Sequence, residues 1–347
     1  MRSHNSIANN LSGKTVLITG ASSGIGRSTA LEFARSSPQN LKLIVTARRV
    51  GRLHELAAEI ESEVGDGVKI FVMELDVSRP EEIEAMFGEQ GLPDEFRDVD
   101  VLVNNAGFMS GVEQAPDIPT HVIQDVWATN VQGVINMTQA VMKIFKRQPD
   151  GGKGDIVMIG SIAGREAYVG GSIYCASKAA IRAFTDALRK ESISTRIRII
   201  TVDPGQVLTE FNDIRHRFDK EKADEVYAGC DPLTPDDVAE LIVFASSRRE
   251  NVVVADMLPQ YTSTDTYESG AQLFSSFDVG KAHGDGFESD YDEHCMEGNY
   301  YTEHDRTWSR YGLKSFVGSF YSNLGSKDDK NLYLLRVFAR IWVWKTI

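Results

Sequence analysis

A tyrosine and a lysine lie one helical turn apart, at Tyr174 and Lys178, in a stretch with helical periodicity. Because residues four positions apart share one face of a helix, the phenol and the amine point to the same side. An isolated phenol has a pKa of about 10, and a nearby ammonium group lowers that pKa by favouring the anion. Ser161 follows an apolar run, and its hydroxyl can hold a substrate oxygen. These three residues predict acid-base chemistry on an alcohol or a carbonyl group.

A Tyr-x-x-x-Lys pattern by itself is common, and a pair on a helix surface is the ordinary explanation for it. The assignment therefore depends on the other motifs of the chain. A glycine-rich turn suits a phosphate group: Lys14–Thr19 resembles a buried strand, Gly20–Gly26 follows it, and Arg27–Ala34 has helical spacing. Such a turn lets the backbone approach a pyrophosphate at the helix N-terminus, where N–H groups and the dipole favour an anion. The predicted cofactor-binding residues of the turn are Gly20, Ser22, Ser23, Gly24, Ile25 and Gly26.

The same turn also spells G-x-S-x-G from Gly20 to Gly24, which is the nucleophile-elbow pattern of serine hydrolases. A hydrolase would leave Gly26 and the Tyr174 and Lys178 pair without a role. Glycines that only serve a turn are a third interpretation. The arrangement of strand, turn and helix favours a dinucleotide site over both alternatives.

The end of the second predicted strand indicates which dinucleotide binds. An acidic residue there would accept a hydrogen bond from the ribose 2′-hydroxyl of NAD. This chain has Ala47-Arg48-Arg49 instead. Guanidinium groups suit a dianionic 2′-phosphate, so the sequence predicts NADP, bound by Arg48 and Arg49. A solvated loop arginine is the alternative, and it fits Arg49 better than Arg48.

Short apolar runs alternate with amphipathic stretches from residue 11 to residue 259, which predicts an α/β domain with a doubly wound Rossmann-type parallel sheet and helices on both faces. The predicted strands are Thr15–Thr19, Lys42–Ala47, Lys69–Leu75, Val101–Asn104, Asp155–Gly160 and Arg196–Val202. The predicted helices between them are Arg52–Glu63, Pro80–Phe87, Ile123–Phe145 and Ile173–Ser192.

Composition narrows the class of protein. The chain has 347 residues, of which 42% are hydrophobic and 25% charged, as in a folded globular protein. Its net charge of -13 argues against binding to nucleic acid. No apolar run is long enough for a transmembrane helix, and no secretory signal is evident. Cys175, Cys230 and Cys295 are far apart, which indicates neither disulfides nor a metal site, so we expect a cytoplasmic protein.

Taken in order, the motifs resemble those of the short-chain dehydrogenase/reductases. Asp76 after the third strand, Asn104 to Gly107 after the fourth, and Pro204 to Thr209 after the sixth extend the match. The resemblance implies that Tyr174 is the acid/base, that Ser161 polarises the carbonyl, and that Lys178 contacts the ribose and tunes the tyrosine. It also implies that Asn130 supports a proton-relay water, which completes a catalytic set of Asn130, Ser161, Tyr174 and Lys178. The cofactor contacts that it implies are Asp76, Val77, Asn104, Ala106, Gly107, Tyr174, Lys178, Pro204, Gly205, Val207 and Thr209.

The segments Ser161–Tyr168, Gly171–Lys178 and Thr209–Phe211 are similar to one branch of that family, the NADP-dependent 3-hydroxy acid dehydrogenases of the serine/allo-threonine type. This branch implies hydride transfer between NADP(H) and a small 3-hydroxy acid. Such a substrate carries a carboxylate, so a cation near the pocket is expected. The candidate substrate residues are Ser161, Tyr174, Arg165 and Arg215, although each arginine also fits an exposed loop.

We expect the chain to divide into an N-terminal arm at residues 1–12, a dehydrogenase domain at 13–259, and a divergent, partly disordered C-terminal extension at 260–347. The basic, apolar run Leu332–Trp344 favours docking onto the domain, with attachment to a membrane surface as the alternative. We expect a homo-oligomer, either a dimer or a tetramer. Two other functions stay open: a reductase of a steroid, sugar or xenobiotic carbonyl, and a nucleotide-binding interaction protein with impaired catalysis.

Overall fold

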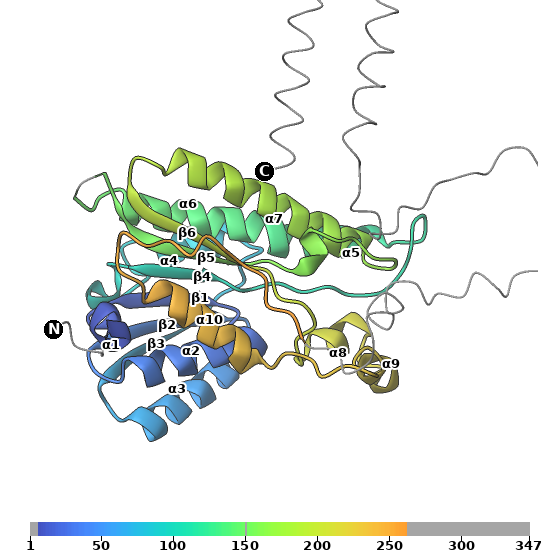
Figure 1. The fold of residues 1–347 in the computed structure, drawn as a ribbon, viewed down its shortest axis with the longest axis horizontal. Helices are drawn as coiled ribbons and strands as arrows, with labels where there is room; N and C mark the ends of the chain where they lie inside the picture. Colours follow the sequence, from blue (N-terminus) through green and yellow to red (C-terminus); the bar gives the residue numbers. More distant parts are fainter. Residues whose placement is uncertain (1–5, 150, 262–347) are drawn as a thin grey trace, which may run out of the picture. The chain divides into compact units, whose positions relative to one another are not determined.

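The computed structural model describes residues 6–149 and 151–261, and their centre is a parallel sheet (Figure 1). The sheet has seven strands in the order β3-β2-β1-β4-β5-β6-β7. Every neighbouring pair in it is parallel. The strands are β1 (Thr15–Thr19), β2 (Leu41–Ala47), β3 (Val68–Glu74), β4 (Val101–Asn104), β5 (Lys153–Ile159), β6 (Arg196–Val202) and β7 (Asp256–Met257). The prediction of a Rossmann-type sheet is confirmed.

Apolar residues predominate in strands β1 to β6 because helices cover both faces of the sheet. Every residue of β1 is buried. Val16 and Ile18 join the core cluster on one face, whereas Leu17 joins the cluster on the other. This alternation follows from the two-residue period of a strand. The edge strand β3 is less buried, as expected for a strand with one neighbour.

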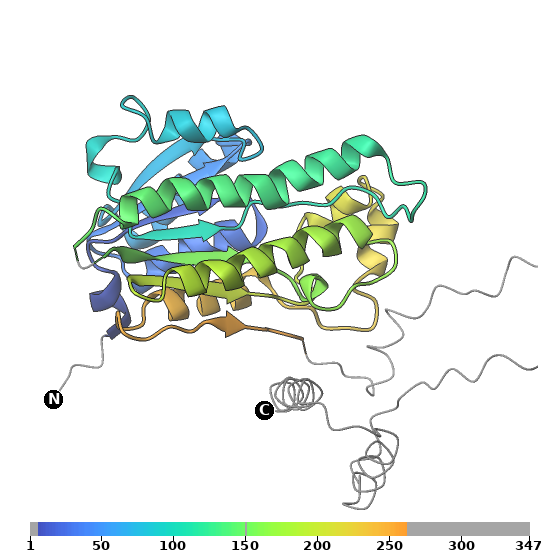
Figure 2. The ribbon, with the colours of Figure 1, turned by 90° about the horizontal axis from the view of Figure 1, so that it is seen from above.

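Seven of the helices flank the sheet in two layers (Figures 1 and 2). One face carries α2 (Gly24–Ser36), α3 (Val50–Val64) and α10 (Pro235–Ser246). The other face carries α4 (Pro80–Met86), α5 (Thr120–Trp127), α6 (Val134–Phe145) and α7 (Ser172–Glu191). Shorter elements are α1 (Ser6–Leu11), α8 (Phe211–Arg215), α9 (Lys220–Glu225) and the 3-10 turns Asp94–Phe96 and Ile162–Gly164.

The helix predicted for Ile123–Phe145 is interrupted. A π-helical turn, Ala128–Gly133, separates α5 from α6. Two contacts explain the interruption: the Asn130 side chain bonds to the backbone of Phe108, and a Cβ atom on Gly133 would lie 2.6 Å from the carbonyl oxygen of Val77. Such π turns occur frequently at functional sites.

The sequence reasoning also missed β7 and α10. The strand β7 has only two residues and thus no periodic pattern. Helix α10 carries a recognisable start signal, because Thr234 and Asp237 form a capping box and Pro235 occupies the first turn. That combination was sufficient to predict the helix.

At the N-terminal end of the described chain, helix α1 packs against the domain. Leu11 is fully buried, and Asn10 donates a hydrogen bond to the carbonyl of Ser247 at 2.8 Å. Across residues 6–149 and 151–261, none of the helices combines the length and apolarity needed to cross a membrane. The predicted extension at 260–347, with its Leu332–Trp344 run, lies outside the described residues from 262 onward.

The strand order reverses between β1 and β4, and this reversal positions the site. Crossovers from β1 proceed to β2 and β3 on one side, and those from β4 proceed to β5 and β6 on the other. In open parallel sheets, ligands bind beyond the carboxyl ends of the strands at such a switch point. The turn after β1 and the segments after β4, β5 and β6 therefore converge at one edge, near α8 and α9 (Figure 1).

We expect that Gly26→Ala destabilises the protein by about 1–3 kcal/mol through overpacking. A Cβ atom at Gly26 would lie 2.6 Å from the carbonyl oxygen of Gly20 and would also collide with the Asn105 side chain. The matched control is Gly51→Ala in helix α3, where a Cβ atom meets nothing within 4 Å. That change should stabilise the helix slightly. Urea unfolding measures both, and equal effects of the two substitutions would contradict the packing argument.

Candidate active site

A cavity of about 1590 Å³ opens at the carboxyl edge of the sheet. It contains most of the residues that the sequence predicted for cofactor and substrate. Those that line it are Gly20, Ser22, Ser23, Gly24, Ile25, Arg48, Arg49, Asp76, Val77, Ala106, Gly107, Ser161, Tyr174, Lys178, Pro204, Gly205, Val207, Thr209 and Arg215. Gly26, Asn104, Asn130 and Arg165 are not among the lining residues.

The glycine turn is fixed by the end of strand β4. Gly20 has a φ of +68°, and a Cβ atom there would lie 2.9 Å from the Cα of Ala106. The Asn105 side chain donates to the carbonyls of Thr19 and Gly20 at 2.9 and 3.2 Å. Gly26 packs against the same amide. The turn therefore follows the backbone of the neighbouring strand closely, and the N–H of Ala21 within it donates to the carbonyl of Thr46 at 3.0 Å.

The sequence assigned the cofactor contact to Asn104, but the structure brings its neighbour Asn105 to the cavity. Asn104 is the last residue of β4, is 3% exposed, and donates to the hydroxyl of Thr138 on α6 at 2.9 Å. Adjacent residues at a strand end face opposite sides of the sheet. Asn104 therefore points into the core, and Asn105 reaches the turn.

The two arginines after β2 both line the cavity. Arg49 donates to the hydroxyl of Ser22 at 3.3 and 3.2 Å and to that of Ser23 at 2.7 Å. Its guanidinium group thus lies against the hydroxyls of the glycine turn. A turn with close backbone approach, two hydroxyls and two guanidinium groups fits a pyrophosphate together with a further phosphate.

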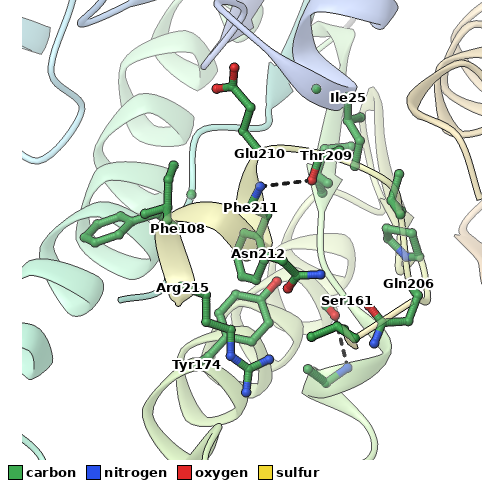
Figure 3. Close-up of a pocket in the computed structure, with 18 of the residues that line it drawn as sticks. Ile25, Phe108, Ser161, Tyr174, Gln206, Thr209, Glu210, Phe211, Asn212 and Arg215 are labelled. Atoms are coloured by element: carbon green, nitrogen blue, oxygen red, sulfur yellow. Dashed lines mark hydrogen bonds between the residues drawn. The ribbon is translucent and has the colours of Figure 1, made fainter. Parts of the chain in front are cut away.

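Ser161, Tyr174 and Lys178 converge at the other end of the cavity (Figure 3 shows the first two). The Ser161 hydroxyl accepts a hydrogen bond from the N–H of Ala163 at 3.1 Å and lies near enough to the Tyr174 phenol to lower its pKa. The Lys178 amine lies 5.6 Å from the centre of the Tyr174 ring and donates to the carbonyl of Ile159 at 2.8 Å. The serine therefore comes from the end of β5, and the other two come from one face of α7.

Burial dominates the titration of this pair. Desolvation raises the pKa of the Tyr174 phenol above its ordinary value, opposed by the hydrogen bond with Ser161 and by the charge of Arg215. Desolvation also lowers the pKa of the Lys178 amine from 10.5 to about 8. The sequence reasoning expected the lysine to lower the pKa of the tyrosine. It omitted burial, which opposes the charged form of both groups.

Asn130 lies behind the site rather than in the cavity. It is 2% exposed within the π turn, and its amide exchanges hydrogen bonds with the backbone of Phe108 at 2.9 and 3.0 Å. The same amide donates to the hydroxyl of Ser177, which is on α7 next to Lys178. Asn130 therefore joins the loop after β4 to the helix that carries the tyrosine and the lysine.

The two arginine candidates for a substrate carboxylate have different surroundings. Arg165 points away from the cavity and pairs with the carboxylate of Asp203 at 2.7 Å. Arg215 lines the cavity. Its guanidinium lies 4.9 Å from the centre of the Tyr168 ring, and donates to the Tyr168 hydroxyl at 3.1 Å and to the Gly170 carbonyl at 3.4 Å. Its Nε is buried and has no hydrogen-bond partner among the described residues.

Sequence reasoning missed the other side chains of α8 and the loops beside it. Phe211 packs against Tyr174, with ring centres 5.2 Å apart. Asn212 and Gln206 also line the cavity, close to Tyr174 and Ser161 in Figure 3. No periodic pattern marks these positions, which lie in or beside the segment Thr209–Phe211 that resembles the 3-hydroxy acid dehydrogenases.

The fold and this site define a class of oxidoreductase. Residues 14–219 match the family described as short chain dehydrogenase. The match spans more than half of the chain and includes the glycine turn, Ser161, Tyr174 and Lys178. The chain belongs to the short-chain dehydrogenase family, whose members act on CH–OH groups.

Individual relatives narrow the similarity further. An NADP-dependent 3-hydroxy acid dehydrogenase of Schizosaccharomyces pombe is 52% identical over 248 residues, which cover 72% of this chain and 92% of that protein. A serine 3-dehydrogenase of Rhizobium radiobacter is 34% identical over 238 residues, covering 69% and 90%. The closed form of a serine dehydrogenase complexed with NADP+ superposes with a TM-score of 0.63 and 35% identity, covering 70% of this chain and 93% of that one.

We expect the stability difference between the wild type and Lys178→Met to depend on pH. Because the folded protein lowers the pKa of this amine from 10.5 to about 8, the unfolded chain binds more protons between these values. The wild type should therefore gain about 3 kcal/mol relative to the variant as the pH rises from 8 to 10.5. Denaturant unfolding across this range measures the gain. Lys190→Met, which removes an exposed lysine from the same helix, is the control, and a pH-independent difference for Lys178→Met would contradict the burial argument.

Proposed function

We propose that this protein is an NADP-dependent oxidoreductase that interconverts a small 3-hydroxy acid, such as L-serine or L-allo-threonine, and the corresponding 3-oxo acid. The observation that carries the proposal is the convergence of Ser161, Tyr174 and Lys178 in the cavity that also contains the glycine turn. The 52% identity to an NADP-dependent 3-hydroxy acid dehydrogenase supports both the reaction class and the cofactor.

The residues of the cavity suit NADP along its whole length. Ser22, Ser23 and the glycine turn would bind the pyrophosphate, and Arg48 and Arg49 would bind the 2′-phosphate. Asp76 and Val77 line the cavity after β3, where the adenine would lie, and Pro204 to Thr209 line it after β6, towards the nicotinamide. When bound, the cofactor accepts the hydride from the substrate carbon, or returns it in the reverse reaction.

The protein's own residues would move the proton. In oxidation, the Tyr174 phenolate takes the hydroxyl proton of the substrate, while Ser161 donates a hydrogen bond to the substrate oxygen. Forming that phenolate is costly in a buried site, since desolvation opposes it. The Ser161 hydrogen bond and the Arg215 charge offset part of this cost. Lys178 would contact the ribose and add a positive charge 5.6 Å from the ring.

Arg215 is the group that we assign to the substrate carboxylate. It lines the cavity, and its charge acts on the Tyr174 phenol. A substrate carboxylate in the cavity would pair with this guanidinium group through a charge-assisted bond. Arg165 is not carried into this proposal, because its charge is paired with Asp203 outside the cavity.

The function is tested by NADPH production with L-serine, L-allo-threonine and 3-hydroxypropionate. We expect turnover with at least one of them, and we expect Tyr174→Phe to lower kcat by at least 100-fold because general acid-base catalysis contributes about 10²–10⁴-fold. Binding of NADP by Tyr174→Phe, followed by calorimetry, should be retained. Near wild-type turnover of the variant would reject the role of the phenol, and activity confined to steroid or sugar carbonyls would reject the substrate class.

We expect Arg215→Met to raise KM for the hydroxy acids by about 10- to 100-fold, which corresponds to the loss of a charge-assisted hydrogen bond of about 1.5–3 kcal/mol. The KM for propane-1,3-diol, which has no carboxylate, should change little, whereas kcat should fall similarly for the diol and the acids, because the Arg215 charge favours the Tyr174 phenolate. The matched control is Arg217→Met, because Arg217 is two residues away, does not line the cavity and pairs with Glu113. Equal rises in KM for the diol and the acids would contradict the role of Arg215 in carboxylate binding.

A further inference from the structure

A glutamate next to helix α8 forms ion pairs with two arginines near the cofactor end of the cavity. Glu210 precedes Phe211, the first residue of α8, and its carboxylate points away from Tyr174 and Arg215 (Figure 3). It bonds to Arg49 at 2.8 Å and to Arg52 at 2.5 Å. Arg52 is the next cationic residue along the chain after Arg48 and Arg49, and it lies in the first turn of α3. Nothing in the proposed reaction uses either Glu210 or Arg52.

The other hydrogen bonds of Arg49 show that Glu210 lies beside the glycine turn. The same guanidinium group donates to the hydroxyls of Ser22 and Ser23 in the glycine turn, at 3.2 and 2.7 Å. A carboxylate that bridges two guanidinium groups has the charge sign and the acceptor geometry of a phosphate group. Glu210 thus forms with Arg49 the same kind of ion pair that a bound 2′-phosphate would form.

We propose that Glu210 is a specificity-determining residue that competes with the cofactor 2′-phosphate for Arg49, while Arg52, which does not line the cavity, pairs with the other Glu210 oxygen. This inference rests on the proposed use of NADP. The Glu210 carboxylate and the 2′-phosphate cannot both pair fully with the Arg49 guanidinium group, because the two negative charges would repel each other. Glu210 therefore weakens the binding of ligands that carry a 2′-phosphate and leaves ligands without it unaffected.

The position of Glu210 also favours a role in specificity over a purely structural one. Its side chain is 38% exposed, and those of Arg49 and Arg52 are 43% and 44% exposed. Ion pairs with this exposure contribute little to stability. Helix α8 has other attachments, including the packing of Phe211 on Tyr174 and the hydrogen bond from Gly111 N–H to the Arg215 carbonyl at 2.8 Å. Removing the charge of Glu210 should therefore leave the fold intact.

The test compares 2′,5′-ADP with ADP as calorimetric ligands of the wild type and Glu210→Gln. We expect Glu210→Gln to tighten 2′,5′-ADP binding by about 3- to 10-fold, which is the range of one or two exposed ion pairs. ADP binding should change less than 2-fold. Glu63→Gln is the charge-matched control, since Glu63 is at the far end of α3 and pairs with Arg35.

Each alternative outcome has a distinct meaning. Unchanged or weaker 2′,5′-ADP binding by Glu210→Gln, or an equal gain for both ligands, would overturn the competition. A gain with Glu63→Gln as large as that with Glu210→Gln would do the same, because the effect would then follow net charge alone. If the wild type itself does not prefer 2′,5′-ADP to ADP, the proposed NADP dependence fails, whatever the variants show.

Discussion

The contact between the ends of strands β1 and β4 is the constraint on which the site depends. Asn105 donates to the carbonyls of Thr19 and Gly20, and the Thr19 hydroxyl accepts hydrogen bonds from the N–H groups of Asn105 and Ala106, both at 3.0 Å. These bonds join the two halves of the sheet where its strand order reverses. Gly26 packs on the same amide, so the first turn of α2 is held against β4. The parallel register then determines where the arginines after β2 and the serine after β5 are placed.

Much of the fold was predictable from local patterns because helices bury both faces of the sheet. Six strands appear as mainly apolar runs, and their predicted bounds agree with the structure to within two residues. The interruption of the Ile123–Phe145 helix was not predictable in this way. It arises from side-chain and backbone contacts of Asn130 and Gly133 with segments far away in the sequence. Apolar periodicity carries no information on such contacts.

The residue types of the site were predictable from the sequence, but the groups that each residue pairs with were less so. Ser161, Tyr174 and Lys178 could be found because strand ends and helical spacing bring them together. Whether Arg165 faces a substrate depends on Asp203, which is 38 positions later and follows β6. The pKa of Tyr174 likewise depends on burial, because desolvation outweighs the neighbouring charges that the sequence made visible. Long-range pairing and desolvation are properties of the folded chain, and spacing alone does not reveal them.

Residues 210–217, beside the cavity, are attached to the domain by two chemically different kinds of contact. Ion pairs join Glu210 to Arg49 and Arg217 to Glu113, whereas Phe211 packs on the ring of Tyr174. Dissolved salt screens exposed charges, with a Debye length of about 8 Å at physiological ionic strength. Salts that are excluded from protein surfaces strengthen apolar packing instead. A rise in the concentration of such a salt therefore acts on the two kinds of contact in opposite directions, since it weakens the ion pairs and strengthens the aromatic packing.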